Sequence, residues 1–223
     1  ADYLLGDEHP ELVELGTSRK GKPRAVYVNG ILTPKEIAVL VGEELSLQKE
    51  RGVDVVWNPT AGKSVKGFFG DNLQALFVNK FGATDETTRL LVRHLRSRVA
   101  GLEPGETVPV YAHSQGGPIV STATAHLSPA ERSRIDLVTY AAASYTYPSG
   151  FHSSRHVVSA KDLVPDVVGK TIHYLFERDV QPIALPFLEH GALEYIKHDP
   201  GPLPEPSRVV PREPGPCVSL SSC

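Results

Sequence analysis

Short segments rich in apolar residues alternate along the chain with longer amphipathic segments. The short ones are predicted to be strands, and they span residues 24–29, 53–57, 107–112, 135–141, 155–160 and 171–177. The first of them is an uninterrupted apolar run, which is typical of strands buried on both faces of a parallel sheet. Amphipathic helices are expected at 34–50, 71–81, 85–99 and 115–126. Strands that alternate with helices predict βαβ units and a mostly parallel, three-layer α/β sheet.

The two ends of the chain differ in character from the middle. Residues 1–23 are polar and acidic and are predicted to be a lead-in, and residues 24–198 are expected to form one folded domain. Seven prolines lie in residues 199–223, which favours an extended polyproline conformation, and this tail is a candidate segment for docking a partner. The only cysteines, Cys217 and Cys223, lie in this tail, so a terminal disulfide and two free thiols both stay open.

Composition narrows the class of function. The 223 residues are ample for a hydrophobic core, and 40% hydrophobic and 22% charged residues are ordinary for a globular domain. A net charge of −3 gives no basic footprint for nucleic acid, and no apolar stretch is long enough for a membrane span. Because the sequence contains no Met, we expect a processed form or a piece of a larger protein, with a secreted or exported parent as one interpretation.

The most informative segment is 108–117, Val-Pro-Val-Tyr-Ala-His-Ser-Gln-Gly-Gly. A predicted strand runs into Ser114, which has Ala112 and Gly116 two positions to either side, and a predicted helix follows. This is the G-x-S-x-G pattern of a nucleophile elbow with Ala at the first small position. Such a sharp turn brings neighbouring chain close to the serine, which only very small residues allow. The turn also places the backbone N–H of Gln115 at a helix N-terminus, where it is predicted to stabilise an oxyanion.

A serine nucleophile needs a histidine base and an acid that orients the base. With an elbow of this kind, the chain order is Ser, then Asp or Glu, then His. Asp162 follows the strand predicted at 155–160 and is the preferred acid, with Asp166 as its alternative in the same loop. A further short helix is predicted at 190–198. His190 opens it and is the preferred base; His198 ends it and is the alternative base, at a helix end that we expect to be solvated.

The second oxyanion donor is expected in the loop that follows the strand predicted at 24–29, as the N–H of Gly30 or Ile31. Together with the elbow and the Ser, Asp, His order, this loop resembles the α/β-hydrolase superfamily over residues 24–198. The elbow resembles that of small, lidless bacterial lipases and esterases. Asn29-Gly30 departs from the commoner His-Gly of lipase-like members. These motifs, with Trp-Asn-Pro-Thr at 57–60, also resemble lipase-type modules inside larger secreted or toxin-like bacterial proteins.

The resemblance implies a three-layer α/β/α hydrolase fold with little or no lid, since the gap between residues 141 and 155 is short. It implies a serine hydrolase that cleaves lipid or other acyl esters through Ser114, His190 and Asp162, without a metal or cofactor. Two alternatives stay open, namely a catalytically silent binding module and a thioesterase or amidase with the same triad. His152 and His156 have a spacing that a metal site can use, but no neighbouring cysteine or acidic set completes one, so a structural role is expected for both.

Overall fold

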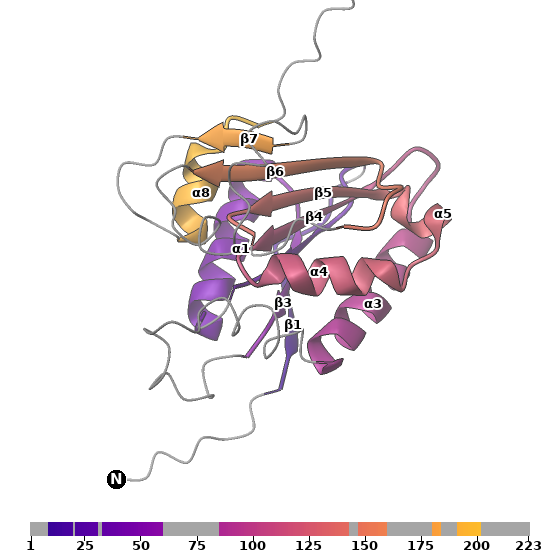
Figure 1. Ribbon diagram of the computed structural model, residues 1–223, viewed down its shortest axis with the longest axis horizontal. Helices are drawn as coiled ribbons and strands as arrows, with labels where there is room; N and C mark the ends of the chain where they lie inside the picture. The colour runs from indigo at the N-terminus through magenta and orange to yellow at the C-terminus, as the bar shows by residue number, and fades with distance from the viewer. Residues whose placement is uncertain are drawn as a thin grey trace, which may run out of the picture.

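A computed structural model of the chain describes residues 9–19, 21–30, 33–59, 85–142, 147–159, 180–183 and 191–201. Its centre is a seven-stranded sheet with the order β1-β3-β2-β4-β5-β6-β7 (Figure 1). The strands are β1 (Glu11–Leu15), β2 (Ala25–Val28), β3 (Val53–Trp57), β4 (Val108–His113), β5 (Ile135–Tyr140), β6 (Ser153–Ser159) and β7 (Val180–Ile183). All neighbouring strands pair in parallel except β1, which is antiparallel to β3. The predicted mostly parallel α/β sheet is confirmed.

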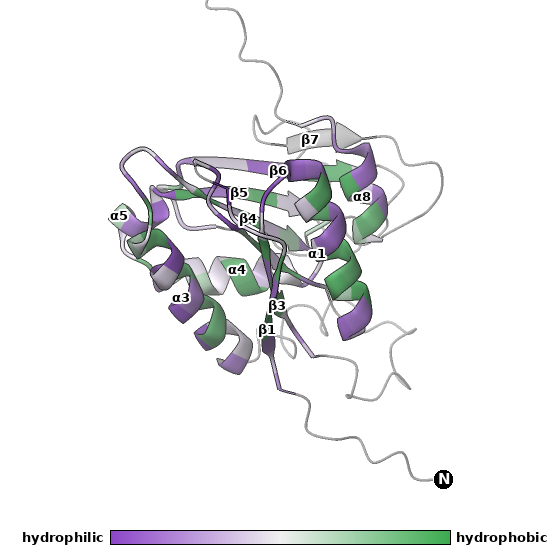
Figure 2. Cartoon of the chain, turned by 180° about the vertical axis from the view of Figure 1, so that it is seen from behind, coloured by the Kyte–Doolittle hydropathy of each residue, from purple (hydrophilic) through white to green (hydrophobic). Residues whose placement is uncertain are grey.

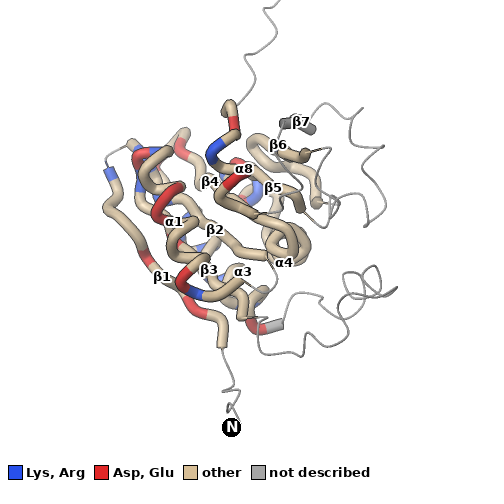
Figure 3. Tube along the Cα trace, turned by 90° about the vertical axis from the view of Figure 1, so that its left-hand side faces the viewer, with Lys and Arg blue, Asp and Glu red and all other residues tan. Residues whose placement is uncertain are grey.

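Helices cover both faces of this sheet, which gives the three layers expected from the sequence (Figure 1). On one face, α1 (Lys35–Lys49) and α8 (Ala192–His198) share a core with Tyr27, Tyr111 and Tyr140 of the sheet. On the other, α3 (Asp85–Ala100) and α4 (Gly116–Ala125) pack in a second core. Hydrophilic and hydrophobic stretches follow one another along α1 and α3 (Figure 2), as expected for helices with one face on a core. Helix α4 carries no charged residue (Figure 3).

Two elements differ from the sequence prediction. Strand β1 lies in residues 1–23, which the sequence analysis assigned to a polar lead-in, yet it pairs with β3 along its whole length, from Glu11 opposite Trp57 to Leu15 opposite Val53. It is an edge strand, exposed or half-exposed throughout, so it lacks a continuous apolar run such as that of β2. Strand β7, which contains Pro182, lies outside the strands predicted from the sequence. Because β7 has only β6 as a neighbour in the described sheet, an edge position accommodates the proline.

Several predictions fall outside the described residues. These are the helix at 71–81, the strand at 171–177 and the tail beyond residue 201. The segment between β5 and β6 is described only in part, so the prediction of little or no lid stays a prediction. A short helix that was not predicted, α5 (Pro129–Arg132), begins with a capping box in which Ser128 and Glu131 bond each other's backbone.

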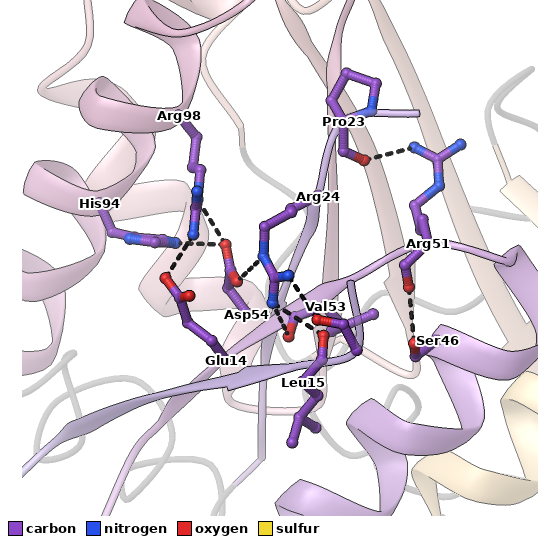
Figure 4. A network of polar contacts seen from close by, with 11 residues as sticks. Glu14, Leu15, Pro23, Arg24, Ser46, Arg51, Val53, Asp54, His94 and Arg98 are labelled. Carbon is purple, nitrogen blue, oxygen red and sulfur yellow. Dashed lines mark hydrogen bonds and ion pairs between the residues drawn. The ribbon is translucent and has the colours of Figure 1, made fainter. Parts of the chain in front are cut away.

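A buried carboxylate fixes the amino end of the sheet. Asp54 of β3 has a fully buried side chain, which accepts from Nε of Arg24 at 2.5 Å and from Nε of Arg98 at 2.7 Å (Figure 4). Nε2 of His94 lies 2.9 Å from the same carboxylate. Burial raises the pKa of Asp54, but the bonds from His94 and Arg24 outweigh it and keep the pKa below its ordinary value. Arg24 also donates to the carbonyl of Leu15, so this cluster ties β1, β2, β3 and α3 together.

Candidate active site

Ser114 occupies the sharp turn between β4 and α4. Its φ of +51° lies in the left-handed region, which a residue with a side chain adopts only when its surroundings hold it there. Its N–H donates to the carbonyl of Tyr140 at 3.0 Å, and its carbonyl accepts from Gly117 at 3.1 Å, so both sides of the turn are fixed. The strand, turn and helix predicted around Ser114 are confirmed, and the strained serine is the geometry that a nucleophile elbow requires.

Neighbouring chain approaches the turn so closely that side chains are excluded. A Cβ placed on Gly116 would overlap the carbonyl oxygen of Val28 and lie 3.1 Å from that of Asn29. A Cβ on Gly117 would lie 2.7 Å from Cβ of Ala142. The close approach of β2 therefore explains Gly116 of the sequence pattern, and the chain that follows β5 leaves equally little room at Gly117.

Two of the three predicted oxyanion residues lie beside the nucleophile. A Cβ added to Gly30 would lie 2.9 Å from Cβ of Ser114, which places this loop residue directly against the elbow. Gln115 is the N-cap of α4, and it is buried, with 3% of its surface exposed. The backbone N–H groups of a helix's first turn point out of its N-terminus and favour negative charge there. The structure thus brings Ser114, Gln115 and Gly30 together.

The side chain of Ser114 is buried, with 1% of the residue exposed. Among the residues that the structure describes, its Oγ has no hydrogen-bond partner. A buried hydroxyl without a partner costs free energy and calls for an explanation, and a catalytic role is one of the recognised explanations.

A network of buried amides lies behind the turn. Nδ2 of Asn29 donates to the carbonyls of Gly30 at 2.8 Å and of Asn58 at 3.2 Å, while the N–H of Asn58 donates to Oδ1 of Asn29 at 2.7 Å. Nδ2 of Asn58 donates to Oε1 of Gln115 at 2.9 Å, and Oγ1 of Thr87 donates to Oδ1 of Asn58 at 3.1 Å. From the sequence, Asn58 entered only as part of the Trp-Asn-Pro-Thr motif, without a role of its own, and Thr87 was not a candidate. The position of Asn58 directly after the buried strand β3, like that of Asn29 after β2, was the available signal.

The other predicted site residues are Ile31, Asp162 with its alternative Asp166, and His190. All of them lie outside the described residues and stay predictions. His198, the alternative base, is described. Its Nδ1 lies 2.9 Å from the carbonyl of Glu194, and 41% of its side chain is exposed.

The end of α8 is exposed at Lys197 and His198, as expected, but the next residue, Asp199, has a fully buried side chain. It forms a bidentate ion pair with Arg155, with distances of 2.5 and 2.8 Å, and accepts from the hydroxyl of Tyr140 at 2.8 Å. Arg155 lies in the amino-terminal half of β6, whereas Ser159 at the carboxyl end of β6 donates its N–H to the hydroxyl of Tyr195. Helix α8 therefore runs antiparallel to β6, and its first turn faces the edge of the sheet that carries Ser114.

His152 and His156 do not converge on a metal site. Nδ1 of His152 lies 2.8 Å from Asp136, while Nδ1 of His156 lies 2.8 Å from the hydroxyl of Thr139. Within the described ranges, no group of three or more His, Cys, Asp or Glu side chains could hold a metal ion. Nor does any described helix have the length and apolar character that a membrane crossing requires.

Comparison with known proteins gives remote structural likenesses. No protein-family profile and no curated protein matches the sequence. Among solved structures, the chain is similar to Aspergillus fumigatus lipase B at 18% identity and TM-score 0.39. The match covers 57% of this chain but only 26% of the lipase, so the chain spans about a quarter of the lipase's length. It is similar to Trichoderma reesei cutinase in complex with a phosphonate inhibitor at 15% identity and TM-score 0.43, over 78% of this chain and 70% of the cutinase. A mouse α/β hydrolase domain-containing protein matches at 14% identity and TM-score 0.43, over 82% of this chain and 88% of its own.

Proposed function

We propose that this chain is a serine hydrolase of the α/β-hydrolase type that cleaves carboxylic esters, with Ser114 as its nucleophile. The observation that carries the proposal is the strained, buried Ser114 at φ +51°, in a strand-to-helix turn whose neighbouring glycines leave no room for a Cβ. Backbone strain of this kind persists only where the surroundings impose it, and it is concentrated at functional sites. The unpartnered Oγ of Ser114, stated for the described residues, supports the same role.

His190 and Asp162 complete the proposed triad. Asp162 follows Ser159, the last residue of β6, by three positions, and His190 precedes the first residue of α8 by two. Ser159 and α8 are in contact through the hydroxyl of Tyr195, at the carboxyl end of β6. Because Ser114 follows β4 at the same edge of the sheet, these sequence positions support the assignment. His198 is disfavoured, since α8 carries it toward the amino end of β6.

The proposed reaction is acyl transfer to water in two steps. Oγ of Ser114 attacks the ester carbonyl while His190 takes its proton, and the resulting oxyanion is stabilised by the N–H of Gln115 and that of Gly30 or Ile31. Collapse of this intermediate breaks the bond to the alcohol, which leaves with the proton from His190. Water then attacks the acyl-enzyme with the same base, which releases the carboxylic acid and restores Ser114. Asp162 orients the imidazole throughout.

Replacement of the nucleophile tests the proposal. Ser114→Ala should abolish hydrolysis of p-nitrophenyl acyl esters and labelling by a fluorophosphonate, because it removes the hydroxyl that attacks the ester carbonyl and the phosphorus of the probe. Ser97→Ala is the matched control, since Ser97 is exposed on α3 and should retain full labelling. Labelling of Ser114→Ala at the wild-type rate would contradict the proposal. A folded wild type that is never labelled would instead favour the catalytically silent binding module. Rates on matched ester, thioester and amide substrates distinguish an esterase from a thioesterase or an amidase.

The choice of base is tested by two histidine variants. His190→Ala should lower kcat by about 10³-fold or more, as removal of a triad histidine does. His198→Ala should leave kcat within about 2-fold, because an exposed side chain at the far end of α8 takes no part in the reaction. Steady-state kinetics with one ester substrate measures both. The reverse result would move the base to His198.

A further inference from the structure

Asn58 has all four of its polar groups engaged inside the protein, with only 1% of the residue exposed. Its backbone N–H and C=O both bond the side chain of Asn29, at 2.7 and 3.2 Å. Its side chain donates to Gln115 and accepts from Thr87. These partners are themselves buried, at 0% exposure for Asn29 and Thr87 and 3% for Gln115. A fully satisfied buried network of this kind is rigid and specifies one arrangement.

The network connects the two sides of the proposed oxyanion hole. On one side, Asn29 bonds the backbone of Asn58 and also the carbonyl of Gly30, so the loop after β2 is fastened to the end of β3. On the other side, the amide of Asn58 holds Gln115, the residue directly after the nucleophile. Residues from three separate strand ends therefore meet at Asn58.

We propose that Asn58 is a positioning residue for ester hydrolysis, which sets the separation between the oxyanion donor of the elbow and the donor of the loop after β2. This inference rests on the proposed function. Oxyanion donors act only when they lie about 2.7–3.1 Å from the developing charge, and a displacement of about 1 Å can cost about 10²-fold in rate. Asn58 acts on the reaction only through other residues: directly through Gln115, and through Asn29 on Gly30.

Two adjacent threonines of α3 offer a matched test. Oγ1 of Thr87 donates to Asn58, whereas Oγ1 of Thr88, also buried, has no hydrogen-bond partner among the described residues. Thr87→Val should lower kcat for a p-nitrophenyl ester by about 3-fold to 10-fold, the effect of one lost hydrogen bond. KM should stay within about 2-fold, because the defect concerns the transition state. Thr87→Ser keeps the hydroxyl and should restore kcat, and Thr88→Val should leave it within about 2-fold.

Asn58→Ala removes the centre of the network and should lower kcat by about 10-fold to 100-fold, with KM again little changed. Urea unfolding of each variant identifies any that fails to fold, and in that case the threonine series decides. This inference is overturned if Thr87→Val and a folded Asn58→Ala both keep the wild-type kcat. If the wild type hydrolyses esters and is labelled at Ser114 in the same experiments, the proposed function stays intact. A wild type without hydrolysis or labelling would overturn both.

Discussion

Gly116 is the residue of the elbow with the least room for a side chain. Because a Cβ there would overlap the carbonyl of Val28 in β2, Gly116→Ala must push the turn away from the sheet. We expect the free energy of unfolding to fall by about 1–3 kcal/mol, as in other overpacked cores, and esterase activity to fall with it. Gly101→Ala is the control, since its Cβ would lie 3.7 Å from its nearest neighbours. Urea denaturation measures both, and equal stability of the two variants would contradict the steric account.

The elbow could be predicted from sequence because its determinants are local. Ser114, Gln115 and Gly116 are consecutive, and the strand before them and the helix after them carry their own hydrophobic patterns. The bond from Asn58 to Gln115 joins residues 57 positions apart, and it exists only because β3, β2 and β4 lie side by side in the sheet. No local pattern predicts such a contact, so Asn58 became a candidate only in the structure.

Helix α8 is held against the sheet by the buried pair of Asp199 and Arg155. Burial raises the pKa of Asp199, but the hydrogen bonds from Arg155 and Tyr140 lower it by more, so the pKa lies below its ordinary value. Asp199→Asn removes the buried negative charge that pairs with Arg155 and should reduce the free energy of unfolding at neutral pH by about 3 kcal/mol. Glu194→Gln, in a partly exposed pair with Lys197 on the same helix, should change it by less than about 1 kcal/mol.

The pH dependence of this difference follows from the lowered pKa. A carboxylate with a depressed pKa stabilises the folded state above its unfolded pKa, near about 4, and loses that contribution as the pH falls through its folded pKa. The gap between wild type and Asp199→Asn should therefore be full at pH 7 and shrink below about pH 4. Urea titrations at pH 7 and pH 3.5 measure it. A gap that stays constant over this range would show that Asp199 stabilises α8 by packing alone.

Strands and helices differ in how far their sequence patterns specify them. Val53–Trp57 is buried throughout and was predicted with its full bounds, because valine and tryptophan favour strands and Asn58-Pro59 closes the segment. Edge strand β1 faces solvent and was missed, and β7 was missed since it contains Pro182. Helix α5 could have been found, because Ser128 and Glu131 form a capping-box pattern that the apolar periodicity does not reveal.

The two edges of the sheet carry different kinds of residues: stabilising carboxylates toward the amino ends of the strands and the proposed catalytic residues at their carboxyl ends. Three carboxylates have lowered pKa values and are each bonded to several donors. Asp54 and Asp136 are the second residues of β3 and β5, and Asp199 pairs with Arg155 in the amino-terminal half of β6. Asp136, for example, accepts from Thr107 and Ser153. Ser114 and the amide network lie at the opposite, carboxyl edge. The charges that stabilise the fold are thus separated from the proposed chemistry.

This separation predicts two distinct transitions on acidification. If a neutral histidine is the base, ester hydrolysis should be lost on protonation of that histidine while the fold is still intact, and should recover fully when the pH is raised again. The fold should persist until the carboxylates at the amino end are protonated below about pH 4, since their lowered pKa values preserve their ion pairs above it. Trp57, the single tryptophan, is buried at the end of β3, so its fluorescence reports unfolding while initial rates report activity. Coincident loss of both signals would mean that activity is lost through unfolding and not through protonation of the base.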